Sequence, residues 1–326
     1  MKFLVCFGTF AAATNAPIPI RLTPDGLKMD GHIEGFEPQE YFVELGAEIS
    51  QISDTWTQSV RLVHLSPELT LGPTTVYEYP RDDPLIFESE RNTIGIGIGS
   101  AFFKRVHTTA LVPYLDGALM YTDIEDPSWL CERFIYRDFD RNGLRQSFAL
   151  SLSADVSLIP NPMIDRDVRT HGQYTHVPRT FRLSLSSDAD IIPRDLFEII
   201  MRELRILEGG LLNRHLHEYY DGENFYCENF VDSLPSIRFT INNDPFIFAH
   251  NHEHTEPIRI VLEPREYVDV DPVTGVCKLR VKSGNDWQHS LTFGRTILRN
   301  FALHIDHDNM RIGFCDMREH AFAGLK

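Results

Sequence analysis

The chain has 326 residues, with 31 Lys and Arg against 47 Asp and Glu, so its formal net charge is −16 at pH 7. This acidic balance disfavours nucleic acids and anionic membrane surfaces as partners, because both are polyanions that select basic proteins. The length is sufficient for one or two domains with a sizeable core, and no apolar run after the N-terminal segment reaches the roughly 20 residues that a membrane-spanning helix needs.

The N-terminal 16 residues have the pattern of a secretory signal peptide: Lys2 supplies the basic charge, an apolar run follows, and small residues lead to Ala16. If this leader is cleaved, residues 17–38 form a short pro-like segment, and the protein belongs to the secretory pathway or the extracellular space. The alternative is a buried strand or helix that the mature protein retains. In that case we expect the chain to belong to a larger complex in an organelle.

Two stretches alternate between apolar and polar residues as β-strands do. Residues 40–46 form the first of them. Near the C-terminus, apolar residues alternate with small or polar ones over 301–305, residues 306–309 supply turn chemistry, and residues 310–314 return as a second strand. This pattern predicts a β-hairpin with one buried face.

The C-terminal stretch resembles the end of pepsin-like aspartic proteases, in which a Trp, a Leu-Arg-Asn segment and a closing Ile-Gly-Phe recur in this order. The three motifs are found here at Trp287, at residues 298–300 and at residues 312–314. The family's Leu-Gly-Asp is replaced by Phe293-Gly294-Arg295.

Further segments extend the resemblance along the chain. Residues 234–241 resemble the family's Leu-Pro-x-Ile-x-Phe strand, and residues 258–267 resemble the strand that pairs with it. Residues 193–204 resemble the helix that follows the second catalytic loop. In the first half, residues 94–100 resemble a Gly-Ile-Leu-Gly-Leu strand, and residues 109–120 fit the helix after it.

The resemblance implies an all-β, bilobal pepsin-like fold with short helices. A shortened N-terminal lobe then spans residues 39–140, and the C-terminal lobe spans residues 141–326. The flap that closes the family's cleft has Val76–Tyr79 as its counterpart, and the segment that follows, through Glu90, is abbreviated.

Both catalytic carboxylates of the family are replaced at the positions that the resemblance assigns to them. In the family, a strand ends in two apolar residues followed by Asp-Thr-Gly, and the counterpart here is Leu62-Val63-His64-Leu65-Ser66. Counting back from Pro193 places Ser184 at the second carboxylate. Aspartic proteolysis needs two carboxylates that share a proton, and neither His64 nor Ser184 supplies one. The resemblance therefore implies a catalytically inactive member of the family.

An active hydrolase is the alternative. Asp54-Thr55 lies near the first catalytic position, but it lacks the preceding apolar pair and the Gly that the tight loop needs. If the two loops meet, His64 beside Ser184 would form the base and nucleophile of an acyl transfer, although no orienting acid or oxyanion hole is identifiable. The alternative is thus an atypical aspartic endopeptidase or a Ser/His hydrolase.

A pepsin-like cleft holds an extended peptide by backbone hydrogen bonds, so it can bind a peptide without cutting it, and exposed lobe surfaces can serve as assembly interfaces. The resemblance therefore implies a pseudoenzyme with protein partners. It would be either a structural subunit of a larger complex or a secreted peptide or protein binder. The short flap favours the subunit, because a peptide clamp needs its lid. We expect no cofactor.

Apart from Cys6 in the leader, the chain has four cysteines, a number that suits an oxidising compartment. Four cysteines allow three pairings. Their pattern resembles the β-secretase branch of the family, which implies Cys131 with Cys315 across the lobes and Cys227 with Cys277 inside the C-terminal lobe. Free thiols in a reducing compartment are the alternative.

One histidine cluster has the composition of a metal site. His250, His252 and His254 alternate, so in an extended segment the three imidazoles share a face and can converge on zinc or copper. The cluster falls at the tip of a predicted hairpin, however, which favours a solvated loop. We therefore expect no bound metal.

Overall fold

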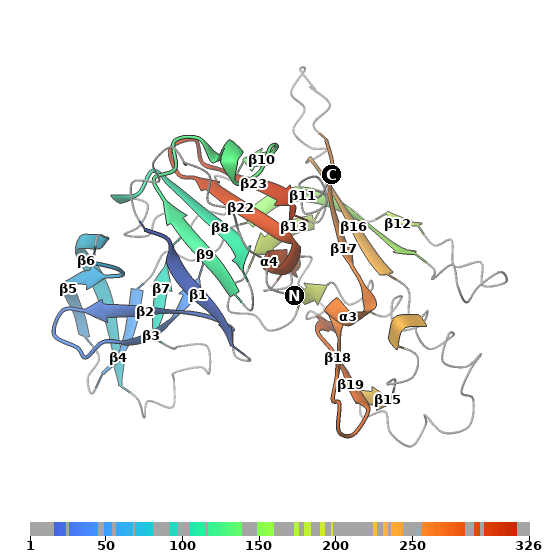
Figure 1. Ribbon diagram of the computed structural model, residues 1–326, viewed down its shortest axis with the longest axis horizontal. Coiled ribbons are helices and arrows are strands. Elements are labelled where there is room, and N and C mark those ends of the chain that lie inside the picture. The colour runs from blue at the N-terminus through green and yellow to red at the C-terminus, as the bar shows by residue number, and fades with distance from the viewer. Residues whose placement is uncertain are drawn as a thin grey trace. The chain divides into compact units, whose positions relative to one another are not determined.

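The computed structural model describes residues 16–23, 26–44, 49–53, 57–67, 69–80, 92–96, 105–114, 117–138, 149–159, 173–175, 179–183, 190–192, 197, 224–226, 231–233, 236–243, 256–283, 290–293 and 297–317. Strands predominate in these ranges and the helices are short, so the protein is all-β, as the sequence predicts (Figure 1). None of the helices described is long and apolar enough to cross a membrane.

The chain forms two compact units, and the first contains both ends of the sequence. It comprises residues 1–148 and 298–326, and the second comprises residues 149–297. This division differs from the two lobes that we expected, which met at residue 140. Residues 298–326 belong to the first unit because they contain β22 (Phe301–Asp306), which pairs with β8 (Thr108–Tyr114) of that unit.

In the first unit, twelve of the described strands form one sheet, in the order β10-β23-β22-β8-β9-β1-β2-β3-β7-β4-β6-β5. Besides β8 and β22, its strands are β1 (Ile18–Thr23), β2 (Gly26–Ile33), β3 (Gln39–Glu44), β4 (Ile49–Ser53), β5 (Thr57–His64), β6 (Thr70–Pro80), β7 (Thr93–Gly95), β9 (Gly117–Thr122), β10 (Ile135–Asp138) and β23 (Arg311–Asp316). A 3-10 helix, Pro127–Trp129, lies between β9 and β10.

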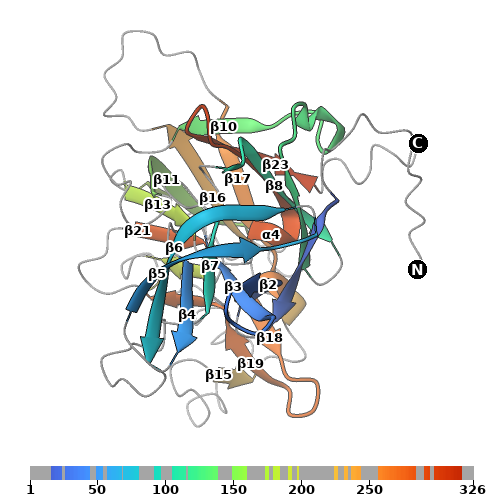
Figure 2. The same cartoon turned by 90° about the vertical axis from the view of Figure 1, so that its left-hand side faces the viewer.

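The sheet of the first unit curls back on itself. Its last strand in the order, β5, pairs with β6 and also with the end of β2, where Ile33 lies opposite Val63. Figure 2 shows β5 and β6 side by side. This extra pairing brings His32 of β2 opposite His64 of β5.

Residues 109–120 form an antiparallel hairpin of β8 and β9, so the helix expected there is wrong. The local sequence explains the difference, because Val112 is β-branched and Pro113 would break the interior of a helix. Gly117, at the start of β9, also permits a close approach, since a Cβ there would lie 2.1 Å from the carbonyl oxygen of Ile20.

The hairpin predicted at the C-terminus is confirmed as β22 and β23 (Figure 1). Its turn is held by Asp306, whose Oδ1 accepts a hydrogen bond from the Asn309 amide at 3.0 Å. We expected one buried face, but all six residues of β22 are buried. β22 lies inside the sheet, with β8 paired along one edge and β23 along the other.

The second unit contains an eight-stranded and a three-stranded sheet in its described part. The first has the order β17-β16-β11-β13-β21-β14-β20, with β12 paired to β11, and the second has the order β15-β19-β18. The strands are β11 (Ala149–Ile159), β12 (Gln173–Thr175), β13 (Arg179–Leu183), β14 (Asp190–Ile192), β15 (Asn224–Tyr226), β16 (Ser236–Asn243), β17 (Ile258–Leu262), β18 (Val268–Val270), β19 (Val276–Leu279), β20 (Val281–Ser283) and β21 (Ser290–Phe293). The short helices of this unit after β15 are the 3-10 turn Val231–Ser233 and α3 (Pro264–Tyr267), and α4 (Ile297–Asn300) begins at its last residue and continues into the first unit.

The predicted partnership of two strands in this unit is confirmed. The strands β16 and β17 pair antiparallel, and the buried side chains of Phe239 and Ile260 lie opposite each other. Apart from Phe197, the helix predicted at residues 193–204 lies outside the described residues.

Candidate functional site

The position that the resemblance assigns to the first catalytic carboxylate lies where a strand gives way to a tight bend. Strand β5 ends at His64, and the chain bends over the next three residues. The bend is closed by hydrogen bonds: the Leu65 amide donates to the Leu69 carbonyl at 3.0 Å, and the Leu69 amide donates to Ser66 Oγ at 3.0 Å. The side chains of Leu65 and Leu69 are buried, so apolar packing fixes the bend.

His64 has a side-chain neighbour on each of the two adjacent strands. Its Cα partner on β6 is Thr70, and Thr70 Oγ1 lies 2.9 Å from His64 Nδ1. Its Cα partner on β2 is His32, and the two imidazole rings stack with centroids 5.5 Å apart and planes inclined by 25°. Directly opposed residues project from the same face of a sheet, so the three side chains form a row across β2, β5 and β6.

The buried carboxylate on β6 does not belong to this row. Glu78 is 5 % exposed and accepts hydrogen bonds from Ser59 and from Arg61, the latter at 3.3 Å. Eight residues separate it from Thr70, which corresponds to about 27 Å along a strand with a rise of about 3.4 Å per residue. Glu78 therefore neutralises Arg61 and cannot share a proton with a group beside His64.

The segment Val76–Tyr79, expected as the remnant of a flap, is part of the sheet. It lies in β6 and pairs antiparallel with β5 and parallel with β4. Tyr77, for example, lies opposite Gln58 on one side and Ser50 on the other. A strand paired along both edges cannot swing over a cleft without breaking both ladders.

Several predicted site residues lie outside the part of the chain that the structure describes. They are Ser184, Cys227, His250, His252 and His254, together with Asp54 and Thr55. Cys277 is buried on β19 and is disulfide-bonded. The pairing of Cys277 with Cys227, the meeting of Ser184 with His64 and the role of the three histidines therefore stay predictions.

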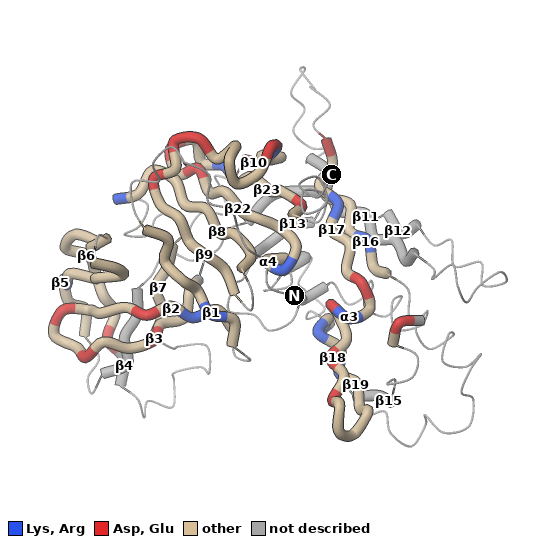
Figure 3. Tube along the Cα trace, viewed as in Figure 1, with Lys and Arg blue, Asp and Glu red and all other residues tan. Residues whose placement is uncertain are grey.

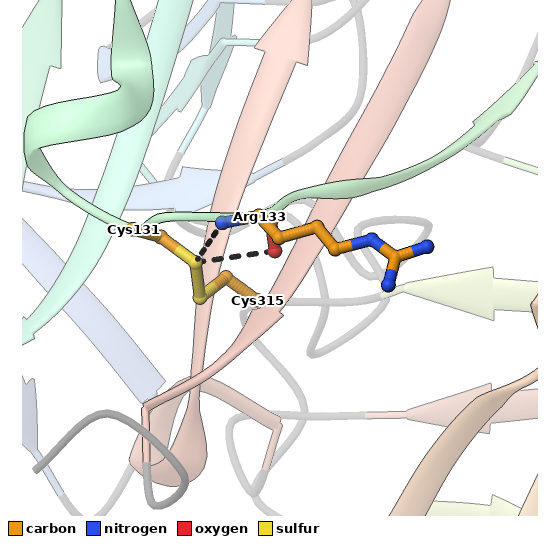
Figure 4. The surroundings of a disulfide bond; sticks show 3 residues. All are labelled: Cys131, Arg133 and Cys315. Carbon is orange, nitrogen blue, oxygen red and sulfur yellow. Dashed lines mark hydrogen bonds between the residues drawn. A yellow bond between two sulfur atoms is a disulfide. The ribbon is translucent and has the colours of Figure 1, made fainter. Parts of the chain in front are cut away.

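Cys131 and Cys315 form a disulfide with Cα atoms 6.4 Å apart (Figure 4). Both cysteines are buried and pack with Ala302, and the Arg133 amide donates a hydrogen bond to Cys131 Sγ at 3.4 Å. The resemblance implied a bridge between lobes. The two cysteines instead lie in the same compact unit, because the strand of Cys315 pairs with β10 just beyond Cys131.

A buried polar cluster that no sequence motif predicted surrounds the C-terminal hairpin. His304 and His307 are 3 % and 0 % exposed, and burial lowers the pKa of each to about 4. Thr109 Oγ1 on β8 lies 3.1 Å from His307 Nε2. Burial raises the pKa of Asp306, but hydrogen bonds from Asn309 and Arg311 outweigh it, and the pKa is lowered.

A glycine leaves the space in which Tyr136 reaches His304. Gly313 on β23 lies opposite His304 on one side and Tyr136 on the other, and Tyr136 Oη lies 2.9 Å from His304 Nδ1. A Cβ at Gly313 would lie 2.8 Å from Tyr136 Cε1, so only glycine lets the phenol lean across the middle strand. Among the residues described, no partner lies within hydrogen-bonding distance of His304 Nε2.

The sequence feature that could have indicated this cluster is His304, which lies on the polar face of the strand predicted at residues 301–305. In an isolated hairpin that face is solvated, so the pattern alone indicated an exposed His304. The rings of Phe134 and Tyr136, which are distant in sequence, pack against His304 and contribute to its burial.

Within the described ranges, no group of three or more His, Cys, Asp and Glu side chains is arranged to hold a metal ion. A scan against models of protein families found no match, and a search of curated proteins also found none. The pepsin-like resemblance therefore stays a prediction from the sequence motifs.

Proposed function

We propose that the chain is a non-catalytic, pepsin-like protein that acts by binding other proteins, as a structural or interaction subunit of a larger assembly or as a peptide or protein binder. The observation that carries this proposal is the state of His64. At the strand end where the resemblance expects the first catalytic carboxylate, the side chain is an imidazole that contacts Thr70 and stacks on His32.

The chemistry of an aspartic protease does not tolerate this replacement. One carboxylate must be ionised to activate water while the other donates a proton to the substrate carbonyl. An imidazole is neutral or cationic, so it cannot supply the shared negative charge. The buried Glu78 is too far along β6 to compensate, and it is already paired with Arg61.

Two features favour an assembly subunit over a peptide clamp. The segment expected as a flap is held in the sheet by β4 and β5, which supports a protein without a lid. Acidic residues also occur along the trace of the first unit (Figure 3). Among them, Glu34 and Glu37 in the segment that joins β2 to β3 are exposed. Charge complementarity favours a basic surface on the partner.

The disulfide between Cys131 and Cys315 supports an oxidising compartment, because such bonds persist there and are rare in the cytosol. We therefore propose that the protein belongs to the secretory pathway or the extracellular space. An organellar complex in which the N-terminus is retained is the second location that we propose.

A peptide-cleavage assay tests the non-catalytic assignment. The full chain is incubated with a mixed peptide library from about pH 3 to about pH 8, the range over which carboxylate and imidazole groups titrate, and products are read by mass spectrometry. The variants are His64→Ala and Ser184→Ala, and the matched control is His107→Ala, whose imidazole is 76 % exposed.

We expect no cleavage by the parent chain at any pH in this range. Cleavage that persists in His107→Ala and disappears in His64→Ala or Ser184→Ala would contradict the proposal. Cleavage that persists in all three variants would indicate a contaminating protease, and further purification would then have to remove it.

A further inference from the structure

The stacked histidines His32 and His64 have the geometry of a two-point metal chelate. They are direct Cα partners on β2 and β5, so both side chains project from one face of the sheet. Zinc binds imidazole nitrogen at about 2.0–2.1 Å, so two nitrogens on one ion lie no more than about 4.2 Å apart. Ring centroids 5.5 Å apart are close enough for side-chain rotation to bring one nitrogen of each ring to this separation.

Thr70 supplies the outer contact that a metal-bound histidine characteristically has. A ligating imidazole usually donates its other ring N–H to an oxygen, which fixes the tautomer and directs the remaining lone pair at the metal. His64 Nδ1 lies 2.9 Å from Thr70 Oγ1, and in the tautomer whose Nδ1–H donates to this hydroxyl, the lone pair resides on Nε2. Thr70 is itself positioned by its pairing with His64 across β5 and β6.

The two imidazoles are also accessible and uncommitted. Both side chains are partly exposed, so an ion can reach them from solvent. Within the described part of the chain, the ring nitrogens of His32 make no hydrogen bond, and those of His64 contact only Thr70.

The local charge favours a cation. Glu34 lies two residues beyond His32, and its carboxylate Oε2 is 3.5 Å from the Leu62 amide, two residues before His64. Glu34 belongs to the turn that follows β2, so its carboxylate adds an attractive field beside the two histidines without being a ligand, and the chain as a whole carries a formal charge of −16.

We propose that His32 and His64 bind a divalent ion of the zinc class, with water completing its coordination. Neutral imidazole is a common ligand for zinc, and two protein ligands leave the remaining positions to solvent. The ion would tie the end of β2 to the end of β5 at the point where the sheet curls back. This site goes beyond the proposed function and does not depend on it.

The experiment is carbethoxylation of histidines by diethylpyrocarbonate on the full chain, with and without ZnCl2, followed by peptide mass spectrometry. The modification reports each histidine separately. Zinc is expected to protect His32 and His64 together and to leave the exposed His107 fully reactive. Protection that is confined to other histidines, or that is absent at His32 and His64, overturns the proposal.

A second test measures how histidine substitutions change the affinity for zinc. Zinc binding is measured by titration calorimetry on the parent chain, on His32→Gln and on His64→Gln, after thermal unfolding has shown that both variants are folded. We expect each substitution to weaken the zinc affinity of the site at His32 and His64 about tenfold or more. A variant in which His250, His252 and His254 are all replaced by Ala separates the loop cluster from the pair.

The proposal predicts that this triple variant keeps the zinc protection of His32 and His64. If zinc binding is lost in the triple variant and unchanged in His32→Gln and His64→Gln, the loop cluster is the site and the proposal is wrong.

Discussion

The two buried histidines of the C-terminal hairpin couple the stability of the first unit to pH. Burial lowers the pKa of His304 and of His307 to about 4, whereas an unfolded histidine titrates near 6.5. Between these values the unfolded chain binds more protons than the folded one, so the free energy of unfolding rises with pH. The stabilisation is complete above about pH 6.5 and is lost as the pH falls towards about 4.

This predicts a loss of up to about 3 kcal/mol for each histidine between pH 7 and pH 4. In urea unfolding at a series of pH values, His307→Asn should remove about half of the loss above pH 4, because it leaves one of the two titrating imidazoles. The control is His107→Asn, because the His107 side chain is exposed. A parent chain equally stable at pH 4.5 and pH 7 would show that the histidines are not buried in solution.

Gly313 is a residue whose substitution should destabilise the first unit. Alanine there places a Cβ 2.8 Å from Tyr136 Cε1 and 3.1 Å from Phe134. Relief of this overlap displaces the phenol from His304, and overpacking of this kind costs about 1–3 kcal/mol. Chemical denaturation of Gly313→Ala measures the loss. Gly72→Ala is the matched control, because no atom lies within 4 Å of its added Cβ; equal stabilities of the two variants would contradict the packing described.

At the scale of elements, the C-terminal hairpin completes the sheet of the first unit. Strand β22 pairs with β8, and β23 pairs with β10, although the two strands of each pair are more than 170 residues apart along the chain. The disulfide between Cys131 and Cys315 reinforces this contact, with a sequence separation of 184 residues.

Removal of this bond should destabilise the first unit. By restricting the unfolded chain, a disulfide typically contributes about 2–4 kcal/mol. The double variant Cys131→Ala/Cys315→Ala should lose a free energy of this size in denaturant titrations under oxidising conditions. Under full reduction the parent and the variant should converge, and a variant as stable as the oxidised parent would indicate that the bond contributes nothing.

The elements that sequence patterns predicted correctly are those fixed by local alternation or by short connections. The hairpin at residues 301–314 and the pair β16 and β17 belong to this class. The helix predicted at residues 109–120 is wrong because only the family resemblance supported it, whereas Pro113 disfavours a helix interior and Val112 favours a strand.

Other features could not be predicted because they depend on which strands meet. The row of His32, His64 and Thr70 exists because β2 pairs with β5 as well as with β1 and β3, and no local pattern specifies that third pairing. For the same reason, the burial of His304 and the location of the disulfide in one unit followed only from the partners of β22 and β23.

We propose that the molecule as a whole acts through its surfaces. Its acidic charge would attract a basic partner and speed their encounter, an effect that salt weakens. The sheet that accommodates His64 also holds β6 along both edges, which favours a rigid body for docking over a clamp that opens and closes.

The measurement that tests this most directly is the size of the untagged native protein in a gentle extract, by gel filtration with mass spectrometry of each fraction. The chain alone has a mass of 37.5 kDa. We predict that it elutes in a larger particle with a constant set of companion proteins, and that high salt weakens the association. Elution at the mass of the single chain, with no companion in any fraction, would contradict the account.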